Sequence, residues 1–314
     1  MTQTDPRIAI LVPCYNEEAT IAAVVRDFRQ CLPAAAIYVY DNNSRDATSE
    51  RAREAGAFVR IETRQGKGNV VRRMFADIEA DVYVLVDGDD TYDASIAPSL
   101  IGKLIDEGLD IVSGRREATA VAAYRPGHVL GNHLLTGLTS LMFGVKLVDM
   151  LTGYRIMSRR FVKSFPSAAS GFGIETELTV HAVRMRVAMA EVPTHYKERP
   201  VGSASKLNTY RDGVRILLTI AGLMRRERPL IFFSFFFAFF ALFSFVIGIP
   251  VVLDYFRTGL VPRLPTAVLV TGMMMLAFLS LFTGLILDTV TRGRWEIKRL
   301  RYLAIPGPQD LRKP

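Results

Sequence analysis

The chain has 314 residues and a net charge of +8, and its mean hydropathy of +0.21 is high for a soluble protein. Its two cysteines, Cys14 and Cys31, do not suggest a disulfide framework, and its four histidines lack the spacing of a zinc site. No RNA- or DNA-binding motif accompanies the positive charge, so we expect anionic membrane lipid, and no nucleic acid, as the partner of the surplus arginines.

Strand and helix patterns alternate through the first third of the chain. Five short apolar segments are predicted to be β-strands: residues 8–13, 36–41, 58–63, 82–87 and 110–114. Between the first two, Asn16 is predicted to cap a helix that Glu17 and Glu18 open. The apolar face of that helix consists of Ile21, Val24, Val25, Phe28 and Leu32. The alternation predicts a Rossmann-like α/β fold, in which helices cover a mostly parallel sheet.

A polar segment follows each of the first four predicted strands. In chain order these segments are CYNEE, DNNSRDAT, RQGKGN and DGDDTYD. Ligands of parallel sheets bind in the crevice outside the carboxyl ends of the strands. The sequence therefore predicts a nucleotide-binding crevice at this edge of the sheet.

The segment after the fourth strand places Asp87 and Asp89 on either side of Gly88. Two neighbouring carboxylates repel each other unless a cation lies between them, and carboxylate oxygens suit Mg²⁺ or Mn²⁺. Mg²⁺ commonly bridges protein carboxylates and substrate phosphates, so a diphosphate is the expected second partner. The alternative is an acidic surface turn without a metal.

Two later segments, 229–253 and 264–287, contain no charged residue. At about 1.5 Å per residue, each exceeds the ~30 Å hydrocarbon core of a bilayer, so both are predicted to be transmembrane helices. A pair of core helices is the alternative, which the apolar character of residues 232–240 on every helical face disfavours. The preceding residues 207–228 form one apolar stripe flanked by arginines, as expected of a helix lying among the headgroups or of a core helix.

These patterns divide the chain into four predicted parts. They are a first domain at 1–206, a juxtamembrane amphipathic helix at 207–228, two membrane helices with a short exterior loop at 229–289, and a basic tail at 290–314. Basic residues gather before the first span and after the second, so the positive-inside rule places the first domain and both termini in the cytoplasm. The N-terminal residues lack the pattern of a signal peptide. We expect a multi-pass protein of the inner (cytoplasmic) membrane.

The order of motifs resembles the family 2 glycosyltransferases with a GT-A fold. The motifs are VPCYNEE, the strand that ends in Asp41 with NNSRDAT, GKGN, and DGDD. Further on, VDMLTGYRIMSRR, GFGIETEL and RPVGSASK resemble the branch that uses polyprenyl phosphate, which includes dolichyl-phosphate mannose synthases and bacterial polyprenyl-phosphate glucosyltransferases. The resemblance also implies a homo-oligomer, a tetramer in such relatives.

The resemblance implies roles for the residues that match the family's donor motifs. Pro13, Tyr15 and Glu17 match the motif that holds base and ribose, and Asp41 matches the acid that contacts the base. Asp87, Gly88 and Asp89 match the D-x-D segment that binds metal and diphosphate. Many relatives have Gln where this chain has Thr91, so the third metal ligand stays open between Asp90 and water. Lys67 of GKGN lacks a Walker frame but is a candidate for neutralising phosphate.

A second set of residues is assigned to the acceptor. Arg199, Ser205 and Lys206 match a basic motif near the phosphates, and Arg155 is a further candidate for the acceptor phosphate. Asp149 is the candidate base or positioning group, with Glu175 and Glu177 as rivals. A phosphate acceptor is already an anion near neutral pH, so the reaction has less need of a base.

The predicted function is transfer of a sugar from a nucleotide-sugar to polyprenyl (undecaprenyl) phosphate with inversion. UDP-glucose is the favoured donor, followed by UDP-N-acetylglucosamine and GDP-mannose. Three alternatives remain: a family 2 transferase acting on another lipid or lipid-linked glycan, a non-catalytic nucleotide-sugar-binding membrane scaffold, and a transporter that the sheet domain regulates.

Overall fold

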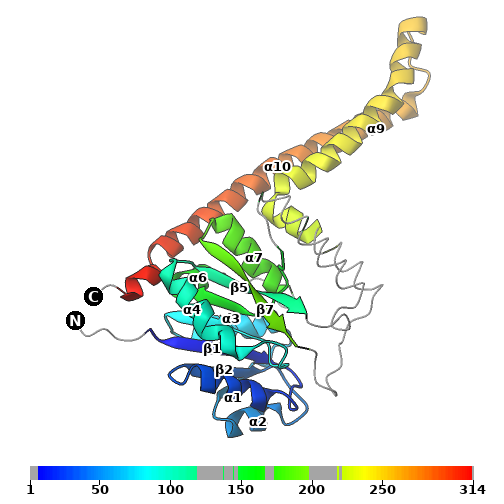
Figure 1. The fold of residues 1–314 in the computed structure, drawn as a ribbon. Helices are drawn as coiled ribbons and strands as arrows, with labels where there is room; N and C mark the ends of the chain where they lie inside the picture. Colours follow the sequence, from blue (N-terminus) through cyan, green and yellow to red (C-terminus); the bar gives the residue numbers. More distant parts are fainter. Residues whose placement is uncertain are drawn as a thin grey trace. The chain divides into compact units, whose positions relative to one another are not determined.

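The computed structural model describes residues 6–118, 137, 144, 148–166, 173–197, 218 and 221–312. Its contacts divide the chain into two compact units. One unit comprises Met1–Asp212 with Lys298–Pro314, and the other comprises Gly213–Ile297. Figure 1 shows the helices and strands of both units.

The first unit is built on a seven-stranded sheet with the order β3-β2-β1-β4-β6-β5-β7. The strands are β1 (Ile8–Cys14), β2 (Ala36–Asp41), β3 (Phe58–Ile61), β4 (Val82–Leu85), β5 (Ile111–Ala118), β6 (Arg155–Ser158) and β7 (Met189–Tyr196). Only β6 runs antiparallel to its neighbours, β4 and β5, so the predicted mostly parallel sheet is confirmed. The five predicted strands all form, while β6 and β7 come in addition.

Helices pack against the sheet in two groups. The helices are α1 (Ile21–Cys31), α2 (Thr48–Glu54), α3 (Lys67–Asp77), α4 (Ala97–Asp106), α6 (Arg159–Ser164) and α7 (Ile174–Met185). Helix α1 contacts α2 and the short helix η1 (Ala94–Ile96), which contacts α4, whereas α3 contacts α6 and α7. The main core joins Ile10, Val12 and Val84 of the sheet to Val25 of α1 and Leu104 of α4.

The predicted start of the first helix is wrong. Helix α1 begins at Ile21, and its N-cap residue Thr20 makes no capping hydrogen bond with its side chain. Asn16 instead has a left-handed backbone with φ of 53°, and its side chain accepts a hydrogen bond from the backbone N–H of Arg45. Asn16 thus belongs to a loop–loop contact, and a turn separates it from the helix.

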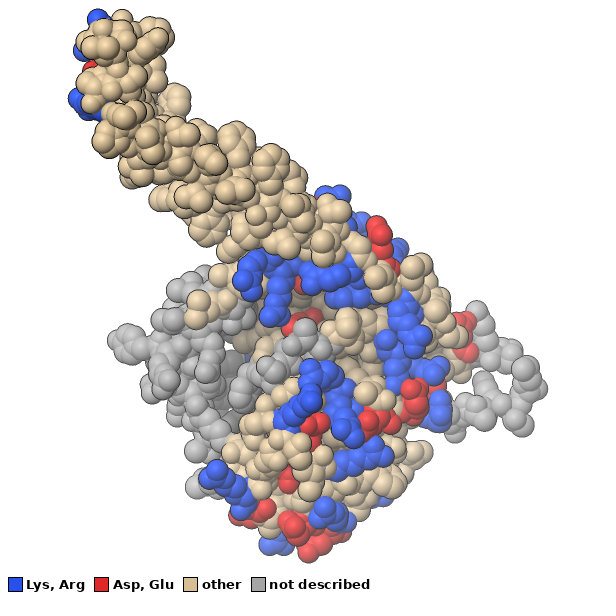
Figure 2. Space-filling model, turned by 180° about the vertical axis from the view of Figure 1, so that it is seen from behind, with Lys and Arg blue, Asp and Glu red and all other residues tan. Residues whose placement is uncertain are grey.

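The second unit contains two long apolar helices, α9 (Pro229–Thr258) and α10 (Leu264–Leu303), whose last residues return to the first unit. Their apolar windows have hydropathies of 2.7 and 2.1 and are only 6% and 11% buried, which makes both long and apolar enough to cross a membrane. Figure 2 shows the same character, since Lys and Arg gather only near the ends of this stretch. The apolar helices suggest membrane association.

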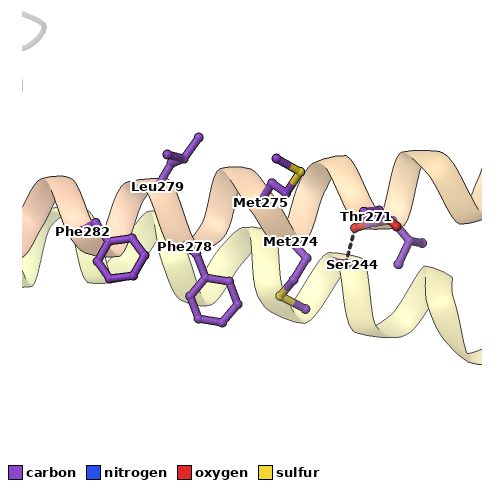
Figure 3. Close-up of a pocket in the computed structure, with 8 residues that line it drawn as sticks. Ser244, Thr271, Met274, Met275, Phe278, Leu279 and Phe282 are labelled. Carbon is purple, nitrogen blue, oxygen red and sulfur yellow. Dashed lines mark hydrogen bonds between the residues drawn. The ribbon is translucent and has the colours of Figure 1, made fainter.

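Helices α9 and α10 contact each other through small side chains. A Cβ atom on Gly284 would lie 3.0 Å from the Cβ of Phe233. Ser244 donates a hydrogen bond of 2.9 Å to the carbonyl oxygen of Val270, which satisfies its hydroxyl inside an apolar surface (Figure 3). Beside this contact, Met274 and Phe278 line a shallow apolar groove.

The segment after the apolar part of α10 belongs to the sheet unit. Tyr302 donates a hydrogen bond of 2.6 Å to Asp110 at the start of β5, and Leu311 of the short helix η3 (Pro308–Arg312) packs against the main core. Residues 290–314 were predicted to be a basic tail, whereas the structure makes Lys298–Pro314 part of the first unit. Of the predicted interfacial helix, residues 221–227 are helical and nearly all of the rest lies outside the described residues.

Candidate active site

The loops that follow β1 and β2 lie beside each other at the carboxyl edge of the sheet. Their strand ends are paired, with Cys14 opposite Asp41. The backbone N–H of Asn16 donates to Ser44 Oγ at 2.9 Å, and Glu18 accepts from the N–H of Ala47 at 2.9 Å. These reciprocal bonds hold the two loops together as one wall at the carboxyl edge of the sheet.

The residues expected at the nucleotide lie on this wall. The Asp41 carboxylate is nearly buried and accepts from the Ser44 N–H at 2.9 Å and from the Ser49 hydroxyl at 2.6 Å. Pro13 is buried, while Tyr15 and Glu17 are half-buried. The structure therefore brings together the four residues of the first two loops that are predicted to hold the nucleotide-sugar.

Asn42 organises the third loop, and the sequence reasoning missed it. Its side-chain N–H groups donate to the carbonyl oxygens of Glu62 and Arg64 at 2.9 and 2.8 Å. Its carbonyl oxygen accepts from the N–H of Gly66 at 2.6 Å. The available signal was an asparagine directly after a predicted strand. A side-chain amide that becomes buried there must satisfy its hydrogen bonds with nearby backbone groups. Asn42 thereby positions the turn that opens α3 with Lys67.

Lys67 reaches into the acidic segment after β4. Its Nζ lies 2.5 Å from Asp87 Oδ1 and 2.5 Å from Glu175 Oε1. Burial alone would lower the pKa of Lys67, but the negative charges of Asp87 and Glu175 outweigh burial and raise this pKa above its ordinary value. Lys67 is therefore a charged ammonium group at the centre of the site.

Two glycines make room for this arrangement. A Cβ atom on Gly88 would lie 2.6 Å from the sulfur of Cys14, and one on Gly153 would lie 2.2 Å from Asp87 Oδ2. Both distances are far inside van der Waals contact, so neither position accepts a side chain without movement of its neighbour. The glycine of the motif LTGYR is thus placed directly against the first aspartate of D-G-D.

Asp89 lies deeper than Asp87, with 4% of its surface exposed. Its Oδ1 accepts a hydrogen bond of 2.6 Å from the hydroxyl of Thr91. The two carboxylates are hard oxygen donors that fit Mg²⁺ or Mn²⁺. No cluster of three or more His, Cys, Asp or Glu side chains that could hold a metal occurs among the described residues. Two carboxylates are fewer ligands than Mg²⁺ or Mn²⁺ takes, so an ion held here would need water and phosphate oxygens to complete its coordination.

Asp149 is held by Arg116, another residue that the sequence reasoning missed. The Nε and Nη2 atoms of Arg116 each lie 2.7 Å from one oxygen of the Asp149 carboxylate. The Arg116 guanidinium also lies 5.7 Å from the ring centre of Tyr196. Because both oxygens of Asp149 already accept N–H groups, this geometry favours the positioning role over the role of base.

The structure corrects the expectation for Arg155. Its side chain is buried, with 1% of the residue exposed, and its guanidinium donates to the carbonyl oxygens of Met150 and Thr152 and to the Thr179 hydroxyl. Burial lowers its pKa. This guanidinium braces the LTGYR turn against α7, and its burial argues against contact with an acceptor phosphate.

The other predicted site residues lie either on α7 or outside the described part of the chain. Arg199, Ser205 and Lys206 lie outside the described residues. Glu177 is half-buried in the first turn of α7, two residues after Glu175. Of the two predicted rivals of Asp149, Glu175 is therefore the one that the structure brings to Lys67.

Comparison with known proteins supports the same assignment. The family model described as glycosyl transferase family 2 matches residues 9–165. Glycosyltransferase AglJ of Haloferax volcanii is 36% identical over 237 residues, which cover 74% of this chain and 76% of that protein. The dolichyl-phosphate hexose transferase of the same organism is 30% identical over 221 residues, covering 70% of this chain and 95% of that protein.

A solved structure has the same sheet architecture. Glucosyl-3-phosphoglycerate synthase from Mycobacterium tuberculosis, in complex with Mn²⁺ and UDP-glucose, superposes with a TM-score of 0.56 at 25% sequence identity. The match covers 70% of this chain and 78% of that one. The GT-A fold that the motifs implied is thereby confirmed, and by the matched family model and the similar glycosyltransferases together this chain belongs to glycosyl transferase family 2.

Proposed function

We propose that this glycosyltransferase moves a hexose from a nucleotide-sugar, UDP-glucose in the first instance, to polyprenyl phosphate with inversion at the anomeric carbon. The observation that carries the proposal is the placement of Asp87 and Asp89 after β4, with Lys67 on Asp87. Two carboxylates and one ammonium group at the carboxyl ends of parallel strands are suited to a metal-bound diphosphate. The similar proteins crystallised with Mn²⁺ and UDP-glucose support this class of donor.

Polyprenyl phosphate is proposed as the acceptor for two reasons. The relative of 30% identity that spans most of this chain carries the name dolichyl-phosphate hexose transferase. The chain also has two helices apolar enough to reach a lipid acceptor within the bilayer. A soluble nucleotide-sugar and a membrane-bound acceptor would then meet at a domain tethered to the membrane.

The chemistry follows from the charges of the two substrates. A bound Mg²⁺ or Mn²⁺ would stabilise the charge that grows on the leaving nucleoside diphosphate. Asp87 and Asp89 would hold that ion, with Lys67 paired to Asp87 on its other side. The acceptor oxygen is already anionic near neutral pH, so it needs orientation more than deprotonation. Arg116 and Asp149 form a fixed pair that could assist such orientation. By resemblance, Arg199 and Lys206 would pair with phosphate oxygens.

Attack from the face opposite the leaving group gives inversion, and thus a β-linked product from an α-linked donor. Two other functions compete with this one. A different lipid or lipid-linked glycan as acceptor would use the same donor site, and a non-catalytic scaffold would bind the nucleotide-sugar without turnover.

The test is a transfer assay with the full chain purified in detergent. Radiolabelled UDP-glucose, UDP-N-acetylglucosamine and GDP-mannose are each supplied with undecaprenyl phosphate, and the lipid product is identified by mass. We expect one donor to give a hexosyl-phosphate lipid, EDTA to stop the reaction and Mn²⁺ or Mg²⁺ to restore it. Asp89→Asn should lower the rate by at least a hundredfold, because a metal ligand is lost.

The exposed Asp106→Asn on α4 serves as the matched control and should leave the rate unchanged. Full activity in EDTA would contradict the metal-dependent mechanism. Binding of UDP-glucose without any transfer, across a set of lipid and glycan acceptors, would favour the scaffold.

A further inference from the structure

Lys67 joins two carboxylates that come from different parts of the fold. Asp87 follows β4, Lys67 is the first residue of α3, and Glu175 is the second residue of α7. Both Nζ–oxygen distances are 2.5 Å. The side chains of Glu175 and Lys67 are 8% and 15% exposed, while that of Asp87 is 29% exposed. The ammonium group is therefore shared, and Asp87 is the more exposed of its two partners.

Two members of this cluster, Lys67 and Glu175, are positioned by contacts of their own backbone segments. Gly66, with φ of 125°, ends the turn that Asn42 holds and delivers Lys67 at the start of α3. Helix α7 is fixed near Glu175 by the buried guanidinium of Arg155, which donates to Thr179 one turn later at 2.8 Å. The position of the Glu175 carboxylate is thus set by packing that does not depend on Asp87.

The pairing of Lys67 with Glu175 reduces how far Lys67 neutralises the charge of Asp87. One ammonium group between two carboxylates leaves a net charge of −1, whereas one ammonium group on Asp87 alone leaves none. Asp87 needs residual negative charge to attract a divalent cation. A second carboxylate on Lys67 preserves that charge.

We propose that Glu175 is a positioning residue of the donor site: it shares Lys67 with Asp87 and so keeps Asp87 able to bind a divalent cation. The inference rests on the proposed function, because it assumes that Asp87 takes part in a metal-bound diphosphate site. It assigns Glu175 to the donor side of the reaction rather than to the role of general base. It also explains why the motif GFGIETEL accompanies GKGN and DGDD in one chain.

The test measures Mn²⁺ binding directly, by electron paramagnetic resonance of the full chain in detergent, with and without UDP. Glu175→Gln removes the charge at nearly constant volume, so Lys67 then pairs with Asp87 alone. We expect Mn²⁺ affinity to fall roughly tenfold or more, the range of a charge-assisted contact. Glu175→Asp keeps the charge and should stay within a few-fold of the unaltered chain.

A double-mutant cycle identifies Lys67 as the link. In a Lys67→Met background, Glu175→Gln should change Mn²⁺ affinity by no more than about twofold to threefold, because no ammonium group remains to be shared. The exposed pair Lys103–Glu107 gives the matched control: Glu107→Gln removes an ion pair of 2.6 Å on the surface and should leave Mn²⁺ affinity unchanged. Circular dichroism of each variant verifies the fold.

Three results would overturn the inference. Unchanged Mn²⁺ affinity in Glu175→Gln, with the turnover number alone reduced, would make Glu175 a base. Equal losses in the presence and absence of Lys67 would mean that Glu175 acts on the cation directly. Glu175→Asp behaving like Glu175→Gln would show that shape, and not charge, matters. If the unaltered chain bound neither Mn²⁺ nor UDP, the proposed function would fail first and this inference with it.

Discussion

Gly153 shows how a single missing side chain can determine the geometry of a site. The Cβ of any other residue there would lie 2.2 Å from Asp87 Oδ2, well inside the contact distance of two atoms. The Asp87 carboxylate would have to move, and its contact with Lys67 would be lost or lengthened.

We therefore expect Gly153→Ala to reduce sugar transfer at least tenfold and to weaken Mn²⁺ binding, while the protein stays folded. Gly102→Ala is the matched control, because the nearest atom to its new Cβ, the Asp106 carboxylate, lies 4.0 Å away. In the interior of α4, alanine in place of glycine should stabilise the fold by about 0.5–1 kcal/mol. Equal activity of the two variants would contradict the steric argument.

His181 makes the first unit sensitive to acid. Its ring lies between Phe161 and Phe165, and one ring nitrogen lies 3.2 Å from the Ser164 hydroxyl. Burial, together with the positive charge of Lys298, lowers the pKa of His181 from 6.5 to about 3. The folded state therefore keeps this imidazole neutral at a pH where the unfolded chain protonates it.

The stability that follows is fully present above pH 6.5 and is lost as the pH falls from 6.5 toward 3. In that window His181 should contribute a slope of about 1.4 kcal/mol per pH unit to the free energy of unfolding. Melting temperatures from pH 7 to pH 4 should fall less steeply in His181→Leu than in the unaltered chain. His195→Gln, at an exposed position, should keep the original slope.

At the scale of elements, the five strands of the alternating strand–helix part were predictable, and the two later strands β6 and β7 were not. The strands β1, β2 and β4 are apolar over almost their whole length and buried, as a parallel sheet covered on both faces requires. Strand β6 begins with a buried arginine, and β7 lies at the edge of the sheet and contains Pro193. Pro193 and the polar residues around it give β7 little apolar pattern. A proline is tolerated there because β7 lies at the edge of the sheet.

The C-terminal segment is an element whose role depends on one buried carboxylate. Asp110 is fully buried and accepts hydrogen bonds from Ser158, from two nitrogens of Arg160 and, at 2.6 Å, from Tyr302. A hydrogen bond to a charged group contributes about 1.5–3 kcal/mol. The end of α10 is thus attached to the start of β5.

We expect Tyr302→Phe to lower the free energy of unfolding by about 1.5–3 kcal/mol, because it removes the hydroxyl but keeps the ring beside Arg160. Thermal unfolding in detergent measures the effect. Tyr255→Phe removes the same atom from a ring that is 52% exposed on α9 and should change nothing. Identical melting temperatures for both variants would show that the Asp110 contact adds no stability.

At the scale of the whole molecule, the chain leaves the sheet unit, forms the two apolar helices and then returns. Lys298–Pro314 belong to the unit that contains Asp110, although Tyr302 lies 192 positions after that residue in the sequence. A truncated chain that ends before α9 would lack both apolar helices and also the contact between Tyr302 and Asp110. A soluble version of the sheet unit should therefore retain residues 298–312 through a linker.

The amino-acid sequence by itself determined the α/β class, the five apolar strands, the two apolar helices and the place of the donor motifs after their strands. These features depend on local periodicity and on the rule that parallel strands present their carboxyl ends at one edge. Only the tertiary structure decided which polar side chains meet: Lys67 with Asp87 and Glu175, Arg116 with Asp149, and Tyr302 with Asp110. It also buried Arg155, which the sequence placed at a phosphate. The physical reason is that the type of a charged residue does not identify its partners. Its role depends on its distance to groups that lie far away in the sequence, which chain order does not reveal.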